Sequence, residues 1–145
     1  MDYDIIAEKL KRIRLLLVDD SAMNRKIVKR VLEGKFDVID EAENGLEATK
    51  MCASACYQRH PYHLILMDSH MPVMNGLDAT KSIKSLLETI RIVGVTGNAL
   101  KNEIDSFLDA GADKVMVKPL NLEDFFHYLS DLTVPIFRTD EESAV

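Results

Sequence analysis

The sequence contains no apolar run that approaches the roughly 18 residues of a membrane-spanning helix. It also lacks the positively charged start of a signal peptide, since Asp2 and Asp4 stand at its N-terminus. No cluster of lysine and arginine is dense enough to bind a phosphate backbone, and the net charge is −6. These absences predict a cytoplasmic protein without membrane insertion and without direct nucleic-acid binding.

Cysteine is scarce, with Cys52 and Cys56 the only two. Their spacing of four in a helical pattern places them on one face but does not favour a disulfide within the helix, so we expect reduced thiols. His60 and His63 follow, which makes a zinc site an alternative. Because Pro61 breaks the helix between the histidines and the spacing matches no common finger pattern, we interpret the run as a helix face with a polar end.

The 145 residues fit one domain, which at this size buries roughly two thirds of its unfolded surface. Apolar patterns typical of strands and helices alternate from residue 14 to residue 132, without repeats or low-complexity segments. The expected strands cover residues 15–18, 36–39, 64–68, 92–96 and 115–117, and a helix is expected after each. Five such units predict an α/β fold of the flavodoxin-like, doubly wound (βα)5 type, a five-stranded parallel sheet with helices on both faces.

Two segments lie outside this unit. The leader, residues 1–13, is amphipathic, and we expect an extra N-terminal helix that packs on the domain of residues 14–132. The tail, residues 133–145, has a polar end at 138–143 that we expect to be disordered.

Polar side chains stand at the ends of four apolar runs. Asp19 and Asp20 follow the first strand, Asp68 ends the third, Thr96 the fourth, and Lys118 follows the fifth. The carboxyl ends of parallel strands share one edge of the sheet, where such folds bind ligands. Each close pair of bare carboxylates there would cost about 4 kcal/mol at ~4 Å and an effective dielectric of ~20. The pattern therefore predicts an acidic site that a divalent cation would stabilise.

This arrangement resembles the receiver domain of two-component response regulators, most of all the receivers of hybrid histidine kinases and phosphorelays. The resemblance covers residues 14–132 and depends on five features: the pair Asp19-Asp20, Asp68, the following Met71-Pro72 and Asn75-Gly76, Thr96, and Lys118-Pro119. It implies that Asp68 takes a phosphoryl group from a phosphohistidine of a histidine kinase or histidine phosphotransfer protein. The domain would then act as a signalling switch or relay intermediate, catalysing only its own phosphorylation and slow dephosphorylation.

The resemblance also assigns the surrounding residues. Mg²⁺, with Mn²⁺ as an alternative, would be held by Asp20, Asp68 and the backbone carbonyl of His70, while Asp19 would act mainly through water. Lys118 and the Thr96 hydroxyl would bind phosphoryl oxygens, together with the backbone N–H groups of Ser69 and Gly97.

One position departs from the family pattern. Many receivers carry an aromatic residue three positions before the lysine, whose ring turns inward when the threonine moves, and Val115 stands there instead. We therefore expect a switch that depends on Thr96 without ring rotation, and a domain that stays a monomer or weak dimer.

Other readings remain open. Taken singly, each acid could cap a helix or a turn, Thr96 could be a satisfied strand hydroxyl, and Lys118 a solvated surface charge. An Mg-dependent phosphohydrolase with an aspartyl intermediate would carry an acid two residues after the nucleophile, where this chain has His70. A docking module independent of phosphorylation would not need the set of Asp20, Asp68, Thr96 and Lys118. The joint placement of these residues favours the phosphoacceptor.

Overall fold

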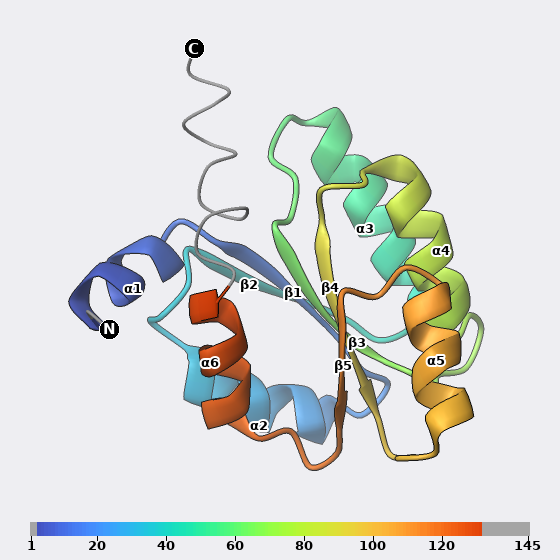
Figure 1. The fold of residues 1–145 in the computed structure, drawn as a ribbon. Helices are drawn as coiled ribbons and strands as arrows, with labels where there is room; N and C mark the ends of the chain where they lie inside the picture. The colour runs from blue at the N-terminus through green and yellow to red at the C-terminus, as the bar shows by residue number, and fades with distance from the viewer. Residues whose placement is uncertain (1–2, 132–145) are drawn as a thin grey trace.

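Five parallel strands form the centre of the protein in this computed structural model, which describes residues 3–131 (Figure 1). The elements in chain order are α1 (Tyr3–Leu10), β1 (Arg14–Val18), α2 (Ala22–Leu32), β2 (Val38–Ala42), α3 (Gly45–Tyr57), β3 (Leu64–Asp68), α4 (Gly76–Leu86), β4 (Arg91–Thr96), α5 (Lys101–Asp109), β5 (Lys114–Val117) and α6 (Leu122–Asp131). The predicted alternation of strands and helices and the parallel sheet are both confirmed.

The strand order β2-β1-β3-β4-β5 places β1 beside β3. Val18 pairs with Met67 at the carboxyl end of this ladder, so the acids that follow β1 lie next to the acid that ends β3. The chain winds outward from β1 to β2 in one direction and from β3 to β5 in the other. Ligands bind parallel sheets at such a reversal point, because the loops there diverge and leave a crevice.

The sheet lies between two layers of helices (Figure 1), and each side has its own apolar cluster. Alternate residues of β1 and β3 belong to different clusters, as strand geometry requires. Leu16, Ile65 and Met67 pack with residues of α3, α4 and α5, among them Cys52, Ile83 and Phe107. Leu15, Leu64 and Leu66 pack with residues of α1, α2 and α6, among them Leu10, Leu32 and Phe125. Both faces of the sheet are therefore covered, which explains why its central strands are continuously apolar.

Polar side chains cap α2, α3, α4 and α6 at the carboxyl edge, whereas α5 begins without a side-chain cap. The side chains of four cap residues each accept the backbone N–H three residues further on, at 2.8–3.2 Å: Ser21, Asn44, Asn75 and Asn121. Each such cap stabilises its helix by about 1 kcal/mol. At the other end, Gly34 and Gly111 follow α2 and α5 with φ of 82° and 117°, a conformation that glycine adopts without strain.

The predicted position of the second strand is wrong. The second strand was expected at residues 36–39 but spans Val38–Ala42, because Phe36 packs into the core before the strand begins. β2 is an edge strand, and its polar Asp40 and Glu41 are only partly buried and find side-chain partners, so the apolar pattern is weak there.

The helix expected after the fourth strand does not begin directly at its end but at Lys101. The Thr96 hydroxyl oxygen accepts the N–H of Asn98, and the Asn98 side-chain oxygen accepts the N–H of Leu100. These two local turns offer the backbone an alternative to the helix and delay its start.

The leader forms α1, and its residues Leu10 and Ile13 are buried in the layer of α2 and α6, as the prediction of a packed helix requires. The tail at 133–145, with the disorder expected at 138–143, lies outside the described residues. None of the helices within residues 3–131 is both long enough and apolar enough to cross a membrane.

Candidate functional site

Three carboxylates meet at the carboxyl edge of the sheet. Asp19 and Asp20 lie in the loop between β1 and α2, and Asp68 is the last residue of β3. Each offers an oxygen, and these oxygens all lie within 4.8 Å of one another. Asp68 is 5% exposed, Asp19 is half-buried and Asp20 is exposed. The convergence predicted from the strand ends is therefore present, with one acid at the base and one at the surface.

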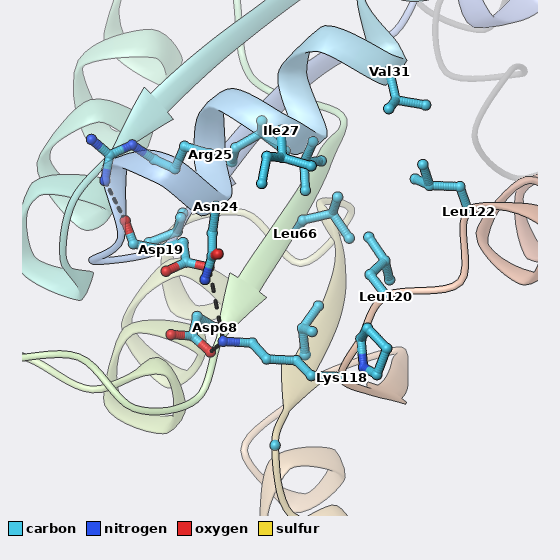
Figure 2. Close-up of a pocket in the computed structure, with 16 residues that line it drawn as sticks. Asp19, Asn24, Arg25, Ile27, Val31, Leu66, Asp68, Lys118, Leu120 and Leu122 are labelled. Atoms are coloured by element: carbon cyan, nitrogen blue, oxygen red, sulfur yellow. Dashed lines mark hydrogen bonds and ion pairs between the residues drawn. The ribbon is translucent and has the colours of Figure 1, made fainter.

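Lys118 joins this group from the end of β5 (Figure 2). Its Nζ lies 2.8 Å from Asp68 Oδ1 and 3.8 Å from Asp19 Oδ2. Burial alone would lower the pKa of the ammonium, but the hydrogen bond and charge of Asp68, with the charges of Asp19 and Asp20, raise it overall. Lys118 therefore remains a cation at neutral pH, and one ammonium faces three carboxylates.

The pKa of Asp68 is also raised, which for a carboxyl group disfavours the charged form. Burial raises the pKa of the Asp68 carboxyl, and the charges of Asp19 and Asp20 add to the rise, while the hydrogen bond and charge of Lys118 oppose it. The ionised carboxylate is thus incompletely compensated by protein groups. A hard cation with oxygen ligands would complete the charge balance, and three carboxylates are the ligands that Mg²⁺ prefers.

Thr96 and Gly97 lie at the end of the neighbouring strand, β4. Thr96 is buried, and its Oγ1 accepts the Asn98 N–H at 3.1 Å, which leaves the hydroxyl proton available to another acceptor. Gly97 is exposed and lines the same groove as Asp68. A Cβ at Gly97 would meet no atom within 4 Å, so the backbone there is open to an approaching ligand.

The backbone N–H of Ser69 departs from the expectation. It donates to the carbonyl of Val95 at 3.0 Å and so extends the ladder between β3 and β4. In this structure the Ser69 N–H is therefore already hydrogen-bonded within the sheet, and it could donate to a phosphoryl oxygen only through a bifurcated hydrogen bond. His70 is exposed, as expected for an imidazole that faces solvent, and the role of its carbonyl stays a prediction.

Val115 occupies the middle of β5, paired with Gly94 in the register. It is half-buried and packs at the margin of the layer of α3, α4 and α5. The absence of a ring at this position is thus accommodated by ordinary packing. The expected consequence for switching stays a prediction.

A groove of about 610 Å³ opens beside the acids (Figure 2). Asp68 and Lys118 lie toward one end, and the remainder is lined mostly by apolar side chains of α2, of the central strands and of the segment between β5 and α6. Among these are Ile27, Val31, Leu66, Leu120 and Leu122. The site is therefore continuous with an apolar surface.

Sequence reasoning missed Arg25. Arg25 lines the groove, and its guanidinium donates from Nη1 to the backbone oxygen of Asp19 and from Nε to Glu41 at 3.2 Å. A basic residue within two turns of the acidic pair was the signal in the sequence. Its partner lies on β2, whose place beside β1 only the fold reveals.

The zinc alternative finds no support in the described part of the chain. There, a group of three acids, Asp19, Asp20 and Asp68, has the spacing to hold a metal ion, and the cysteines and histidines do not form one. Cys52 is buried and Cys56 half-buried, both as free thiols. His63 accepts the Arg14 N–H through Nδ1 at 3.0 Å, a structural contact.

Comparison with known proteins agrees with this geometry. Residues 15–130 match the family described as response regulator receiver domain. The chain is 44% identical over 115 residues to "Two-component response regulator ORR41" of Oryza sativa subsp. japonica, covering 78% of this chain and 88% of the relative.

Two solved structures support the same assignment. The receiver domain of the histidine kinase CKI1 from Arabidopsis thaliana, complexed with Mg²⁺ and BeF3⁻, is similar with a TM-score of 0.76 at 25% identity, over 87% of this chain and 93% of that one. A chain in the co-crystal of the Saccharomyces cerevisiae histidine phosphotransfer protein Ypd1 with the receiver domain of Ssk1 has a TM-score of 0.69 at 27% identity, over 86% and 88%. By its sequence, its fold and the residues at its acidic edge, the chain belongs to the response regulator receiver domain family.

Proposed function

We propose that Asp68 accepts a phosphoryl group from a phosphohistidine of a partner protein. The observation that supports this role most directly is the 2.8 Å contact between Lys118 Nζ and Asp68 Oδ1, inside a group of three acids at the reversal point of the sheet. A carboxylate in that position is a nucleophile with a fixed cation beside it. The domain would carry the signal as an aspartyl phosphate.

The transfer is a displacement at phosphorus. An Asp68 carboxylate oxygen forms a bond to phosphorus, the bond from phosphorus to the imidazole nitrogen breaks, and that nitrogen keeps the electron pair. Lys118 would neutralise charge on one phosphoryl oxygen, and the Thr96 hydroxyl and Gly97 N–H would donate to others. Asp20 and Asp68 would hold Mg²⁺, which would supply positive charge to offset that of the carboxylates and the phosphoryl group.

The acidic group fits such a metal by its chemistry, since it offers carboxylate oxygens and no nitrogen or sulfur ligand. We assign Asp20 and Asp68 as direct ligands with the His70 carbonyl, and Asp19 as a residue that orients the site through water. Mn²⁺ would bind the same oxygens.

Mg²⁺ is expected to stabilise the domain against heat. Free metal at about tenfold above Kd adds roughly 1.4 kcal/mol to the free energy of unfolding, a rise of several degrees in Tm. Asp20→Asn should reduce that response and raise the metal-free Tm, because it removes one of three repelling charges from an exposed position. Calorimetric melts with and without Mg²⁺ measure both effects. Asp105→Asn, on exposed α5, serves as the control, and a full Mg²⁺ response in Asp20→Asn would remove this residue from the metal site.

The partner would dock on α2. Met23, Ile27 and Val31, at a spacing of four, form an apolar stripe and are 72%, 58% and 42% exposed. Residues 22–32 also carry four basic residues and no acid. This surface adjoins the groove that leads to Asp68 (Figure 2). It fits a histidine kinase or histidine phosphotransfer protein that presents apolar residues flanked by acids around its histidine.

Replacing Ile27 with glutamate is expected to slow phosphorylation by a partner protein but not phosphorylation by a small-molecule donor. Transfer from a phosphorylated histidine phosphotransfer protein should slow by about tenfold or more, because a charge replaces an apolar contact worth ~1.4 kcal/mol. Phosphorylation by acetyl phosphate should be unchanged, since that small donor needs no docking surface. Loss of label from the donor, followed on gels, measures the first rate, and mass spectrometry measures the second.

The matched control for this experiment is Tyr57→Glu. Tyr57 is 90% exposed at the end of α3, in the other layer of the fold, and its substitution should alter neither rate. An Ile27→Glu variant that keeps the wild-type transfer rate would show that the partner docks elsewhere. A variant equally slow with both donors would show that the substitution damages the site and not the docking.

Several finer assignments are part of the proposal. We infer a cytoplasmic domain that does not bind nucleic acid directly, catalyses only its own phosphorylation and slow dephosphorylation, and stays a monomer or weak dimer when phosphorylated. The exposed His70 at the position where an aspartyl phosphohydrolase carries its general acid supports the signalling role over hydrolysis.

A further inference from the structure

The guanidinium of Arg25 bridges three segments of the fold. Its side chain is only 15% exposed, although it comes from the outer helix α2. Nη1 donates to the backbone oxygen of Asp19 after β1, and Nε donates to Glu41 Oε1 on β2 at 3.2 Å (Figure 2 shows the contact with Asp19). A half-buried arginine with two fixed acceptors is a rigid connector.

The backbone of Asp19 is held to β2 on both sides. Its N–H donates directly to the Ala42 carbonyl at 3.2 Å, and its carbonyl is held by Arg25, which in turn is held by Glu41. The Asp19 carboxylate also accepts the N–H of Ser21 at 2.9 Å. The carbonyl of Asp19 and the N–H of Asp20 belong to one planar peptide group, so holding the first also orients the second.

This anchoring opposes a specific distortion. The oxygens of Asp19, Asp20 and Asp68 lie within 4.8 Å of one another, and without a cation their charges repel. Rotation of the peptide group between Asp19 and Asp20 is the backbone movement that would separate them. Arg25 resists that rotation by its hydrogen bond and adds a positive charge on the side of the loop that faces β2.

We propose that Arg25 is a positioning residue, which holds the loop of Asp19 and Asp20 in the conformation that binds a divalent cation. The inference depends on the proposed metal site but concerns a residue that touches neither the metal nor Asp68. Groups that orient metal ligands typically contribute about 10- to 100-fold to affinity. Loss of Arg25 should therefore weaken Mg²⁺ binding while the ligands themselves remain.

The structure provides a matched pair of variants. Arg25 and Lys29 both contact Glu41, at 3.2 and 3.3 Å, but of these two contacts only that of Arg25 is accompanied by a bond to Asp19. Arg25→Met should raise the Kd for Mg²⁺ about tenfold. Lys29→Met should leave it within about twofold. Arg25→Lys should recover only part of the affinity, because one ammonium at the end of a flexible stem does not reproduce the two-point contact.

The Kd is measured by calorimetric titration of the 145-residue chain with MgCl2 alone, at a temperature where melts show each variant to be folded. The second readout is the rate of phosphorylation by acetyl phosphate as a function of Mg²⁺ concentration. Arg25→Met should need about tenfold more metal for half-maximal rate, with the rate at saturating metal close to wild type. A purely structural role would lower Tm without changing the Mg²⁺ dependence.

Each outcome is decisive. An unchanged Kd in Arg25→Met, or the same loss in Lys29→Met, overturns the inference. If Arg25→Met does not fold, Glu41→Gln replaces it. This variant keeps an acceptor for Arg25 but removes the negative charge that holds it, so we expect a severalfold rise in the Kd for Mg²⁺. An unchanged Kd in Glu41→Gln would then overturn the inference. Asp20→Asn separates this inference from the proposed function, since a wild-type Kd in that variant refutes the metal site itself.

Discussion

Replacing Asp68 with asparagine is expected to abolish phosphorylation of the domain. Asp68 is where the three acids and the Lys118 ammonium meet, and the amide that replaces its carboxylate is not a nucleophile for phosphorus. Intact-protein mass spectrometry after incubation with acetyl phosphate and Mg²⁺ should show one added phosphoryl group on the wild type and none on Asp68→Asn. Chelation of the metal should prevent the addition to the wild type as well.

The control for this experiment is Asp105→Asn, an exposed acid on α5 away from the carboxyl edge. It should accept one phosphoryl group at the wild-type rate. Quantitative modification of Asp68→Asn would assign the phosphoryl group to another residue and refute the proposed function. Peptide mapping of the modified protein would then identify that residue.

The second large effect is expected at Gly76, the first residue of α4. A Cβ at this position would lie 2.0 Å from the backbone oxygen of Asp68 and 3.1 Å from the Cα of Ser69. The clash is with main chain, so no side-chain rotation relieves it, and either α4 or the end of β3 must move. Gly76→Ala should therefore cost about 3 kcal/mol of unfolding free energy, roughly 10 °C in Tm.

The same substitution should slow phosphorylation, because the displaced backbone carries the nucleophile. Gly97→Ala is the stability control: its Cβ would meet no atom within 4 Å, so its Tm should stay near that of the wild type. Thermal melts of the two variants and their rates with acetyl phosphate test both statements. A Gly76→Ala protein with wild-type Tm would show that the loop after β3 yields more easily than the close approach of α4 implies.

The central part of the fold was predictable because its signals are local. The runs that became β1, β3 and β4 are continuously apolar and end in polar residues. Ser21, Asn44, Asn75 and Asn121 cap α2, α3, α4 and α6. The edge strand β2 was misplaced because Asp40 and Glu41 interrupt its apolar pattern. Their partners, Tyr62, Arg25 and Lys29, are distant in the sequence, so nothing nearby marks these acids as part of a strand.

Part of the candidate site was likewise predictable from the sequence, and part was not. Asp19, Asp20, Asp68, Thr96 and Lys118 were recognised because parallel strands bring all their carboxyl ends to one edge, whatever their order. The hydrogen bond from the Ser69 N–H to Val95 was not recognised, because it depends on β4 lying beside β3. The anchoring of Asp19 by Arg25 was not recognised either, because β2 must lie beside β1 for Glu41 to hold Arg25.

The sequence by itself thus determined the five strand-helix units and the chemistry of the edge at which the strands end. These follow from apolar periodicity, caps and the residue types at strand ends, all of which are properties of short segments. Only the tertiary structure decided the strand order β2-β1-β3-β4-β5, the register that joins Val18 to Met67, and the contacts of Arg25 and Gly76. The physical reason is that strand order, register and these close approaches are set by packing of the whole domain and not by any local pattern, even where the contacting residues, such as Gly76 and Asp68, are near in sequence.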